Sequence, residues 1–525
     1  MRKHLLLSLL SALMLSAGWL SLSGIPLLGA LVPLMLIADD YGTGRRPFWK
    51  LAGWTALTLG LWSAATTWWI WYAAAIGAVL SVLITAGLMG GLFMLWHGIS
   101  LRAGRPLSCT VLVSGWIACE YLYTVGQVSF PWLTLGNGFA CDPWLVQWYE
   151  YTGVFGGSLW VLVANLCLYR AVKAPRQFRR WIAPAAVILL PALFSVVRYL
   201  TYDPGNGPEA TVTVVQPNID PYNEKFDVAQ ADQTALLIRL AEEAPADVDY
   251  IVMPETAIDD HLWEGALEYS ASVEALRNAV RTRCPQARII AGATTFRRYE
   301  ALEPHPATAR TNDNINYWYD VYNSAMEVDT SRRVEIHHKS KLVVGVEKMP
   351  YYEVLKHLEF LIVDLGGISG QLGTDSVRKV FVRPDGLKAG AAICFESVYG
   401  EYMTEFVRGG AGLLFVITND GWWGDTPGHR QHFSFSRLRA IETRRSIARS
   451  ANTGISGFIT PRGDVVGTLG WDRRGTLTER LRTNDTITFY TRYGDYIGRL
   501  GSYVFLLSLL YFVAYRTRRR NHLVP

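Results

Sequence analysis

A β-type run ends on a reactive thiol in the stretch Ala389-Gly390-Ala391-Ala392-Ile393-Cys394-Phe395-Glu396. Two other segments of the same region have this form: residues 251–253 lead through a proline to Glu255, and a third segment leads to Lys339. Sites in α/β proteins are assembled where strands end. We therefore expect an α/β domain in which strand ends bring the cysteine, the glutamate and the lysine together.

Short β-type runs alternate with amphipathic stretches on both sides of Cys394. The β-type runs are Ala210–Val215, Tyr250–Met253, Arg288–Ala291, Tyr322–Val328, Lys379–Val382, Ala389–Ile393 and Leu413–Thr418. The amphipathic stretches, which predict helices, are Ala229–Glu243, Ser270–Thr282 and His432–Ser450. Alternation of this kind is typical of an α/β domain with a substantial buried sheet.

The three reactive side chains have complementary chemistry. A thiol of ordinary pKa, about 8.5, is mostly protonated at neutral pH, so the nucleophile Cys394 needs a base, for which Glu255 is the candidate. Lys339 suits stabilisation of the negative oxygen of a tetrahedral intermediate. Glu347, eight positions after Lys339, is expected to orient Lys339 or Glu255. Singly, each residue is commonplace; their joint occurrence in one domain is the signal.

Much of the rest of the chain is apolar. Half of the 525 residues are hydrophobic, and 19 Trp with 26 Tyr is heavy aromatic usage, as in proteins whose aromatic rings collect at membrane interfaces. A membrane span takes about 20 apolar residues. We predict eight spans, near residues 5–22, 25–38, 51–71, 75–97, 107–125, 154–171, 182–199 and 500–516. The first run resembles a signal peptide at its start but continues past Gly24, so we expect an uncleaved helix.

Basic residues mark alternate loops between these spans. The clusters are Arg2–Lys3, Arg45–Lys50, Arg102–Arg105, Lys173–Arg180 and Arg516–Arg520. The intervening loops hold no Lys or Arg, with Arg198 the one mild exception. Because basic loops stay in the cytoplasm, both termini are expected there. The prediction is a transmembrane domain over residues 1–204 (about seven helices), a periplasmic catalytic domain over 205–495, and a C-terminal helix with a basic cytoplasmic tail over 496–525, in a bacterial inner membrane.

The motifs resemble those of the nitrilase, or carbon-nitrogen hydrolase, superfamily. The resemblance covers about residues 210–490 and implies an α-β-β-α sandwich with Glu255 as base, Lys339 as the lysine and Cys394 as nucleophile. The other matching segments are Gln216–Asn218, Thr418–Gly424 (which holds Asn419 and Trp422), the helix from His432 to Arg445, and Asn452–Gly454.

Spans on both sides of such a domain make the chain similar to the apolipoprotein N-acyltransferase family, as does Phe130-Pro131-Trp132-Leu133. The resemblance implies a ping-pong reaction. Cys394 takes an acyl chain from a phospholipid as a thioester, then passes it to the α-amino group of a diacylglyceryl-modified N-terminal cysteine. No cofactor and no metal are implied, and the expected partners are phospholipid, diacylated apolipoprotein and membrane. No nucleic acid is expected, and a monomer suffices.

Three departures from the family pattern bear on the supporting residues. The Pro-Phe-Gly usual before the glutamate is missing ahead of Glu347, although the spacing from Lys339 is kept. Lys341 is a rival for the lysine, and the spacing favours Lys339. Phe395 stands beside the cysteine where a tyrosine is often found, which removes a hydroxyl and keeps the ring. Glu396, two residues after the cysteine, is a further supporting candidate.

Several features stay open at this stage. Tyr351–Gly367 is apolar and predicts either a lid that admits acyl chains or a core helix of the domain. Trp422 and Trp423 either line an acyl pocket or pack beneath the sheet. Glu120, an acidic residue within a predicted span, is either functional or near the outer interface. His337–His338 and the pair His429 and His432 lack a carboxylate–histidine helix motif, so no metal site is expected.

Two other functions compete with acyl transfer to lipoproteins. A membrane-anchored carbon-nitrogen hydrolase, an amidase or nitrilase, would use the same three residues on a small amide with water as acceptor. A transporter or scaffold would use the domain only to bind. Multiple spans favour a lipid substrate over the first, because one anchor suffices for a soluble substrate. The intact triad and the scarcity of charge inside the spans disfavour the second.

Overall fold

The chain forms two compact units. The computed structural model describes residues 1–225, 227–300, 302–311, 316–351 and 371–521. One unit, which we call the helical unit, comprises Met1–Trp71, Ala75–Thr201 and Tyr493–Pro525. The other, which we call the sandwich unit, comprises Tyr72–Ala74 and Tyr202–Arg492.

Each of the eight predicted spans contains at least part of an α-helix. The helices are α1 (Arg2–Ser16), α2 (Val32–Asp39), α3 (Arg45–Thr67), α5 (Ala75–Ala103), α6 (Arg105–Val125), α7 (Tyr149–Val172), α8 (Arg179–Thr201) and α15 (Tyr496–Asn521). The short helix α4 (Ile70–Ala73) lies between α3 and α5 in the chain. In the described part of the chain, four helices are long and apolar enough to cross a membrane, namely α5, α7, α8 and α15 up to Arg519.

The first predicted span is interrupted, because α1 ends at Ser16 rather than near residue 22. Short 3-10 turns follow, η1 (Ala17–Trp19) and η2 (Ile25–Gly29). The turns bring Gly18 against the backbone of Gly138, where an added Cβ would lie 2.2 Å from the Gly138 carbonyl oxygen. The last turn of the expected helix is therefore absent, and the two backbones approach closely there instead. A hydropathy pattern does not predict such an approach.

Helix α8 contains two internal prolines, Pro184 and Pro191. Proline has no N–H, so the carbonyl of Val187, four residues before Pro191, loses its helical donor. The indole Nε1 of Trp160 on α7 supplies that donor at 2.7 Å. The hydrogen bond ties the two helices together at the point where α8 would otherwise expose an unpaired carbonyl.

The sandwich unit is built on two sheets. The strand order is β13-β1-β2-β4-β5-β6 in the first sheet, with β3 paired to β4, and β12-β11-β10-β9-β8-β7 in the second. In the first sheet the strands are β1 (Glu209–Gln216), β2 (Tyr250–Val252), β3 (Ile258–Trp263), β4 (Arg288–Tyr299), β5 (Trp318–Val328), β6 (Glu335–His338) and β13 (Gly475–Arg482). In the second they are β7 (Val380–Val382), β8 (Lys388–Ile393), β9 (Leu413–Thr418), β10 (Ser446–Ala451), β11 (Ser456–Ile459) and β12 (Val465–Leu469).

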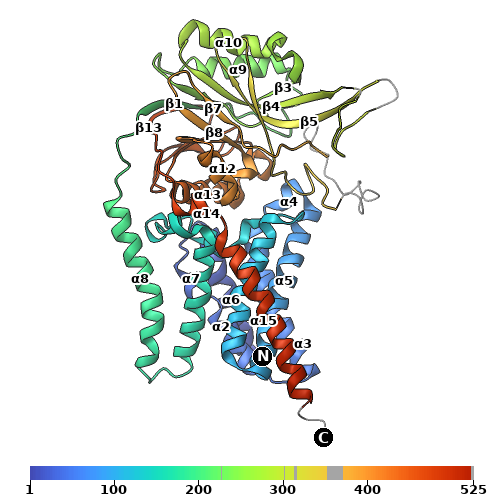
Figure 1. The fold of residues 1–525 in the computed structure, drawn as a ribbon, viewed down its shortest axis with the longest axis vertical. Coiled ribbons are helices and arrows are strands. Elements are labelled where there is room, and N and C mark those ends of the chain that lie inside the picture. The colour runs from blue at the N-terminus through green and yellow to red at the C-terminus, as the bar shows by residue number, and fades with distance from the viewer. Residues whose placement is uncertain (226, 301, 312–315, 352–370, 522–525) are drawn as a thin grey trace. The chain divides into compact units, whose positions relative to one another are not determined.

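Helices cover the outer face of each sheet of the sandwich unit (Figure 1). The first sheet carries α9 (Gln230–Ala241) and α10 (Ala271–Arg283), and the second carries α12 (Gly400–Arg408) and α13 (Pro427–Thr443); the short α14 (Phe489–Tyr493) follows β13. This is the expected α-β-β-α sandwich. Strands β2, β9 and β10 are buried along their whole length, as strands covered on both faces must be.

The first and last strands of the sandwich unit pair with each other over their full length. β1 and β13 run antiparallel from Glu209 opposite Arg482 to Gln216 opposite Gly475. The pairing continues beyond the strands, because Thr483 N donates to Pro208 O at 2.9 Å. The two ends of this unit therefore lie side by side.

All seven predicted β-type runs are strands, but the prediction of one helix over His432–Ser450 is wrong. Helix α13 ends at Thr443, Arg444 takes a left-handed conformation with φ 51°, and β10 begins at Ser446. Strand β10 lies between β9 and β11, and its polar side chains are satisfied inside the sandwich. Its backbone pairs in parallel with β9, which precedes α13 in the chain, and antiparallel with β11, which follows it. A local amphipathic pattern does not reveal this pairing.

Candidate active site

Strand ends of both sheets supply the candidate site. Glu255 follows β2 by three residues, Lys339 follows β6 directly, and Cys394 follows β8 directly. All three side chains are buried. Gly292 on β4 contributes by having no side chain, since an added Cβ would lie 2.5 Å from the Glu255 Cα.

The ammonium of Lys339 lies between two carboxylates. Its Nζ donates to Glu255 Oε1 at 2.8 Å and to Glu347 Oε1 at 2.8 Å. The amide of Asn323 on β5 bridges the same two oxygens, at 2.8 Å from Glu255 and 3.0 Å from Glu347. Burial alone would lower the pKa of Lys339, but the two carboxylates outweigh it and hold that pKa well above its ordinary value. The lysine is therefore a fixed cation.

Both carboxylates are also fixed by backbone donors. The Asn419 N–H, just after β9, donates to Glu255 Oε2 at 3.1 Å, and the Val343 N–H donates to Glu347 Oε2 at 2.8 Å. The backbone of the loop before Glu347 thus binds the Glu347 carboxylate, although the loop lacks the Pro-Phe-Gly sequence. A base whose oxygens are each held in this way is oriented before substrate arrives.

Cys394 occupies a strained position. Its φ of 50° lies in the left-handed region, which is unfavourable for a residue with a Cβ. Burial, reinforced by the carboxylate of Glu255, raises the pKa of Cys394 well above its ordinary value, although Lys339 acts in the opposite direction. The resting side chain is therefore a thiol, and its activation requires a proton acceptor. Strain of this kind at a strand end is characteristic of functional sites.

Glu396 connects the cysteine strand to the lysine loop. Its Oε2 accepts from the Ile393 N–H at 2.8 Å, and its Oε1 accepts from the Ser340 N–H at 2.6 Å. The hydroxyl of Tyr402 also donates to Oε1. Burial would raise the pKa of Glu396, but His337 and Tyr402 lower it below its ordinary value. The carboxylate is thus a clamp that holds the residues before Cys394 next to those after Lys339.

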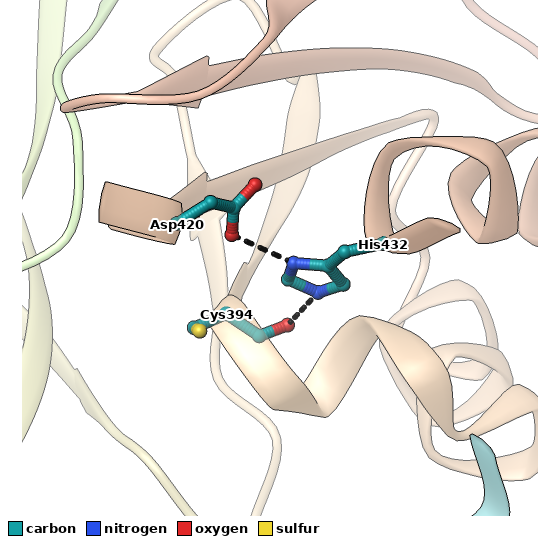
Figure 2. A group of neighbouring side chains, drawn as sticks. All are labelled: Cys394, Asp420 and His432. Carbon is teal, nitrogen blue, oxygen red and sulfur yellow. Dashed lines mark hydrogen bonds and ion pairs between the residues drawn. The ribbon is translucent and has the colours of Figure 1, made fainter. Parts of the chain in front are cut away.

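A histidine behind Cys394 supports its backbone. Figure 2 shows the imidazole of His432 between the carboxylate of Asp420 and the carbonyl of Cys394, while the thiol points away from the ring. The Nδ1 atom lies 2.8 Å from Asp420 Oδ1, and Nε2 lies 3.1 Å from the Cys394 oxygen. Asp420 also binds Arg449 at 2.8 Å, and all of these polar groups are buried.

Cys394, Asp420 and His432 place possible metal-binding atoms within 4.8 Å of one another. Asp420 and His432 already bind each other, and Arg449 supplies a cation to the Asp420 carboxylate. Burial would raise the pKa of Asp420, but Arg449 and His432 hold it well below its ordinary value. The chemistry of this set fits support of the cysteine backbone better than metal ligation.

The remaining predicted residues lie around this centre. Phe395 packs edge-on against Tyr399, with ring centroids 5.2 Å apart. Trp422 packs edge-on against Tyr222 at 5.2 Å, and its carbonyl accepts from the Tyr222 hydroxyl at 2.8 Å. Lys341 has its Nζ 4.9 Å above the Tyr399 ring, whereas Lys339 bears the carboxylate contacts.

Glu120 is buried on α6 and holds a loop of the helical unit. Its Oε1 accepts from Trp116 Nε1 at 3.0 Å and from the Leu135 N–H at 2.8 Å. It thereby fixes the segment that follows Phe130–Leu133. The prediction for Tyr351–Gly367 falls, apart from Tyr351 itself, outside the described residues.

Sequence reasoning missed Asn323, and it treated His432 only as part of a matched helix and as a rejected metal ligand. Asn323 lies in a strand that also contains Asp320, Ser324 and Glu327, so its polarity did not distinguish it from its neighbours. Its role depends on the pairing of β5 with β6, which places its carbonyl 2.8 Å from the Lys339 N–H. His432 acts through the backbone of Cys394, a contact that no spacing rule encodes.

Both units of the chain match families of known proteins. Residues 211–489 match the carbon-nitrogen hydrolase family, and residues 11–167 match the apolipoprotein N-acyltransferase N-terminal domain. The chain is 30% identical to the apolipoprotein N-acyltransferase of Chlorobaculum tepidum over 487 residues, 89% of this chain and 88% of that protein. It is 28% identical to that of Geobacter metallireducens, over 76% of this chain and 72% of the relative.

A solved amidase of the nitrilase superfamily from Nesterenkonia AN1 aligns with 56% of this chain and 98% of its own, at 13% identity and a TM-score of 0.37. The assignment rests on the sequence matches, which extend through both units. The chain belongs to the apolipoprotein N-acyltransferase family, and its sandwich unit is a carbon-nitrogen hydrolase domain.

Proposed function

We propose that this protein transfers a fatty acyl chain from a phospholipid to the N-terminal amine of a diacylglyceryl-modified cysteine in apolipoproteins. The observation that carries the proposal is the buried cluster of Lys339, Glu255 and Glu347 beside Cys394, whose backbone is strained. Apolar helices of the same chain supply access to lipid. The relatives named above are acyltransferases, and their name gives the acceptor.

In the first half-reaction, Glu255 takes the thiol proton and the Cys394 sulfur attacks an ester carbonyl of the phospholipid. A C–S bond forms, and the carbonyl oxygen becomes an anion that the ammonium of Lys339 stabilises. When the intermediate collapses, the C–O bond to glycerol breaks. The lysophospholipid oxygen takes the proton from Glu255 and leaves, and the acyl chain stays on Cys394 as a thioester.

In the second half-reaction, the lipoprotein amine attacks the thioester. Glu255 takes a proton from the amine as the N–C bond forms, and Lys339 stabilises the second oxyanion. The C–S bond then breaks, and the sulfur regains its proton from Glu255. The products are an amide and the free thiol. Glu347 and Asn323 hold Lys339 and Glu255 in place through both steps. Glu347 accepts from the Lys339 ammonium, and the Asn323 amide donates to both Glu255 and Glu347.

The domain boundaries and the orientation belong to the same proposal. Residues 1–204 form the transmembrane domain, 205–495 the periplasmic catalytic domain, and 496–525 the last helix and a basic cytoplasmic tail of a monomeric inner-membrane protein. The distribution of Lys and Arg between the helices supports this orientation. A periplasmic site would meet lipoproteins after their export.

The test is intact-protein mass spectrometry after incubation with phospholipid in detergent. We expect a mass gain of one acyl chain that hydroxylamine removes and that a diacylated lipopeptide discharges. Cys394→Ala should abolish the gain. Cys284→Ala is the matched control, because Cys284 is also buried in the sandwich unit and lies outside the site. An unacylated but folded enzyme would refute the proposal, and acylation by a small amide alone would indicate a membrane-anchored amidase.

A further inference from the structure

A cavity in the helical unit lies among α3, α5 and α15, in segments that the proposed reaction does not use. Its volume is about 590 Å³, within the range of small-molecule sites. The lining residues come from 42–56, 86–102 and 512–516. These are the beginning of α3 and the ends of α5 and α15, whereas the sandwich unit is joined to the opposite end of α15. The cavity is thus at the end of the spans remote from that connection.

Small residues keep one side of the cavity open. Gly87, Gly90, Gly91 and Gly98 line it from α5, at spacings that place them along one helical face. A Cβ added to Gly87 or Gly91 would meet no atom within 4 Å. Ala52 and Ala56 line it from α3. An unbranched apolar chain fits such a surface.

The cavity carries unbalanced positive charge. Arg102 and Arg516 line it, and no Asp or Glu is among its described lining residues. Both arginines are exposed residues, and within the described side chains no carboxylate forms an ion pair with either. Arg102 donates instead to the carbonyl of Gly98 at 2.9 Å. Two free cations beside an apolar groove suit a ligand that has an anionic head and a hydrocarbon tail.

We propose that this cavity binds an anionic phospholipid, with the phosphate between Arg102 and Arg516 and one acyl chain along the glycine face of α5. Basic pockets between membrane helices recognise anionic lipid headgroups in this way. The described lining residues of the cavity include none of the residues of the proposed acyl-transfer site, so this lipid is a second lipid and not the acyl donor. Its role is to bridge α3, α5 and α15, and the inference does not depend on acyl transfer.

The experiment uses the full-length protein with Cys394→Ala, so that no acyl-enzyme forms. Phosphatidylglycerol or phosphatidylcholine is titrated into the detergent-solubilised protein, and bound lipid is counted by native mass spectrometry while thermal unfolding is followed in parallel. We expect phosphatidylglycerol to bind more tightly and to raise Tm more. Each arginine removed, by Arg102→Ala or Arg516→Ala, should weaken its apparent affinity about fivefold, the effect of about 1 kcal/mol per basic residue near a membrane.

Filling the groove tests the site independently of charge. Gly87→Leu with Gly91→Leu should abolish retention of the lipid without unfolding the helix, because leucine favours helix more than glycine does. The controls are Gly60→Leu, an equally open glycine on α3 outside the cavity, and Arg518→Ala, an arginine of α15 outside it. Equal binding of the two lipids, or equal losses in control and site variants, would overturn the proposal and leave only nonspecific lipid contact.

Discussion

Lys339 and Lys341 are two residues apart, yet their surroundings differ in kind. Lys339 contacts two carboxylates, whereas Lys341 lies over the ring of Tyr399. Lys339→Met should slow thioester formation about 10²–10³-fold, the usual effect of removing one oxyanion donor. Lys341→Met should leave the rate near that of the unchanged enzyme. Single-turnover acylation of both variants, checked for folding by Tm, decides between them, and the reverse order would make Lys341 the catalytic lysine.

The reactivity of Cys394 should depend on pH in a distinctive way. Because burial and Glu255 raise its pKa well above the ordinary value, little thiolate is present near neutral pH, and more forms as pH rises. In the absence of substrate, alkylation by iodoacetamide should therefore still be accelerating above pH 9. The rate is followed by peptide mass spectrometry. A rate that levels off near pH 7 would show a preformed thiolate and would remove the need for Glu255 as base.

His432 should act on the position of the nucleophile rather than on the stability of the fold. His432→Ala removes the group beside the Cys394 carbonyl, and a misplacement of about 1 Å can cost about 10²-fold in rate. We expect a fall in kcat of that order with KM unchanged. His429→Ala is the matched control, since His429 lies on the same helix and contacts Asp425 instead. Equal effects of the two changes would refute a specific role for His432.

At this scale, sequence was informative where chemistry follows a strand end and silent where it depends on register. Glu255, Lys339 and Cys394 all stand directly or nearly directly after β-type runs, so their types and places were readable. Asn323 lies within a strand, and its amide reaches two carboxylates only because β5 pairs with β6 as it does. The spacing from Lys339 to Glu347 preserved a contact even though the loop sequence between them is unusual.

Among the elements, α8 shows how an internal proline is accommodated. Trp160→Phe would leave the part-buried Val187 carbonyl without a donor, and the cost of about 1–3 kcal/mol for a fully buried polar group is the upper limit of the expected loss. Pro191→Ala restores a helical N–H to that carbonyl, so the same change in a Pro191→Ala background should cost much less. Unfolding measurements on the four proteins give the coupling energy. Additive effects would mean that the indole contributes only by packing.

Element boundaries were predicted well where the pattern is local. Leu413–Thr418 is a strand over the predicted residues, because a continuous apolar run between a glycine-rich turn and Asn419 fits a strand covered on both faces. The segment after α13 was misread, since Ser446, Arg449 and Ser450 make β10 look polar. Their polarity is balanced by partners far along the chain: Arg449 binds Asp420, and the Ser450 hydroxyl donates to the Val215 carbonyl.

For the whole molecule, the distribution of charge predicts orientation. A green fluorescent protein fused after residue 520 should fluoresce, because the basic end of α15 stays in the cytoplasm, where this reporter folds. Alkaline phosphatase fused after Tyr202 should be active, because it would be exported. The opposite pattern would place the sandwich unit in the cytoplasm and would rule out a periplasmic acceptor.

The paired ends of the sandwich unit have a consequence for how such a protein can be rebuilt. Because β1 and β13 pair over their full length, the segment 202–492, which forms the sandwich unit apart from Tyr72–Ala74, begins and ends at neighbouring positions. A unit with adjoining ends is a natural cassette: it can be inserted into, exchanged between or lifted out of helical hosts with a short linker. Chimaeras that exchange this segment between helical hosts can therefore be joined at Tyr202 and Arg492.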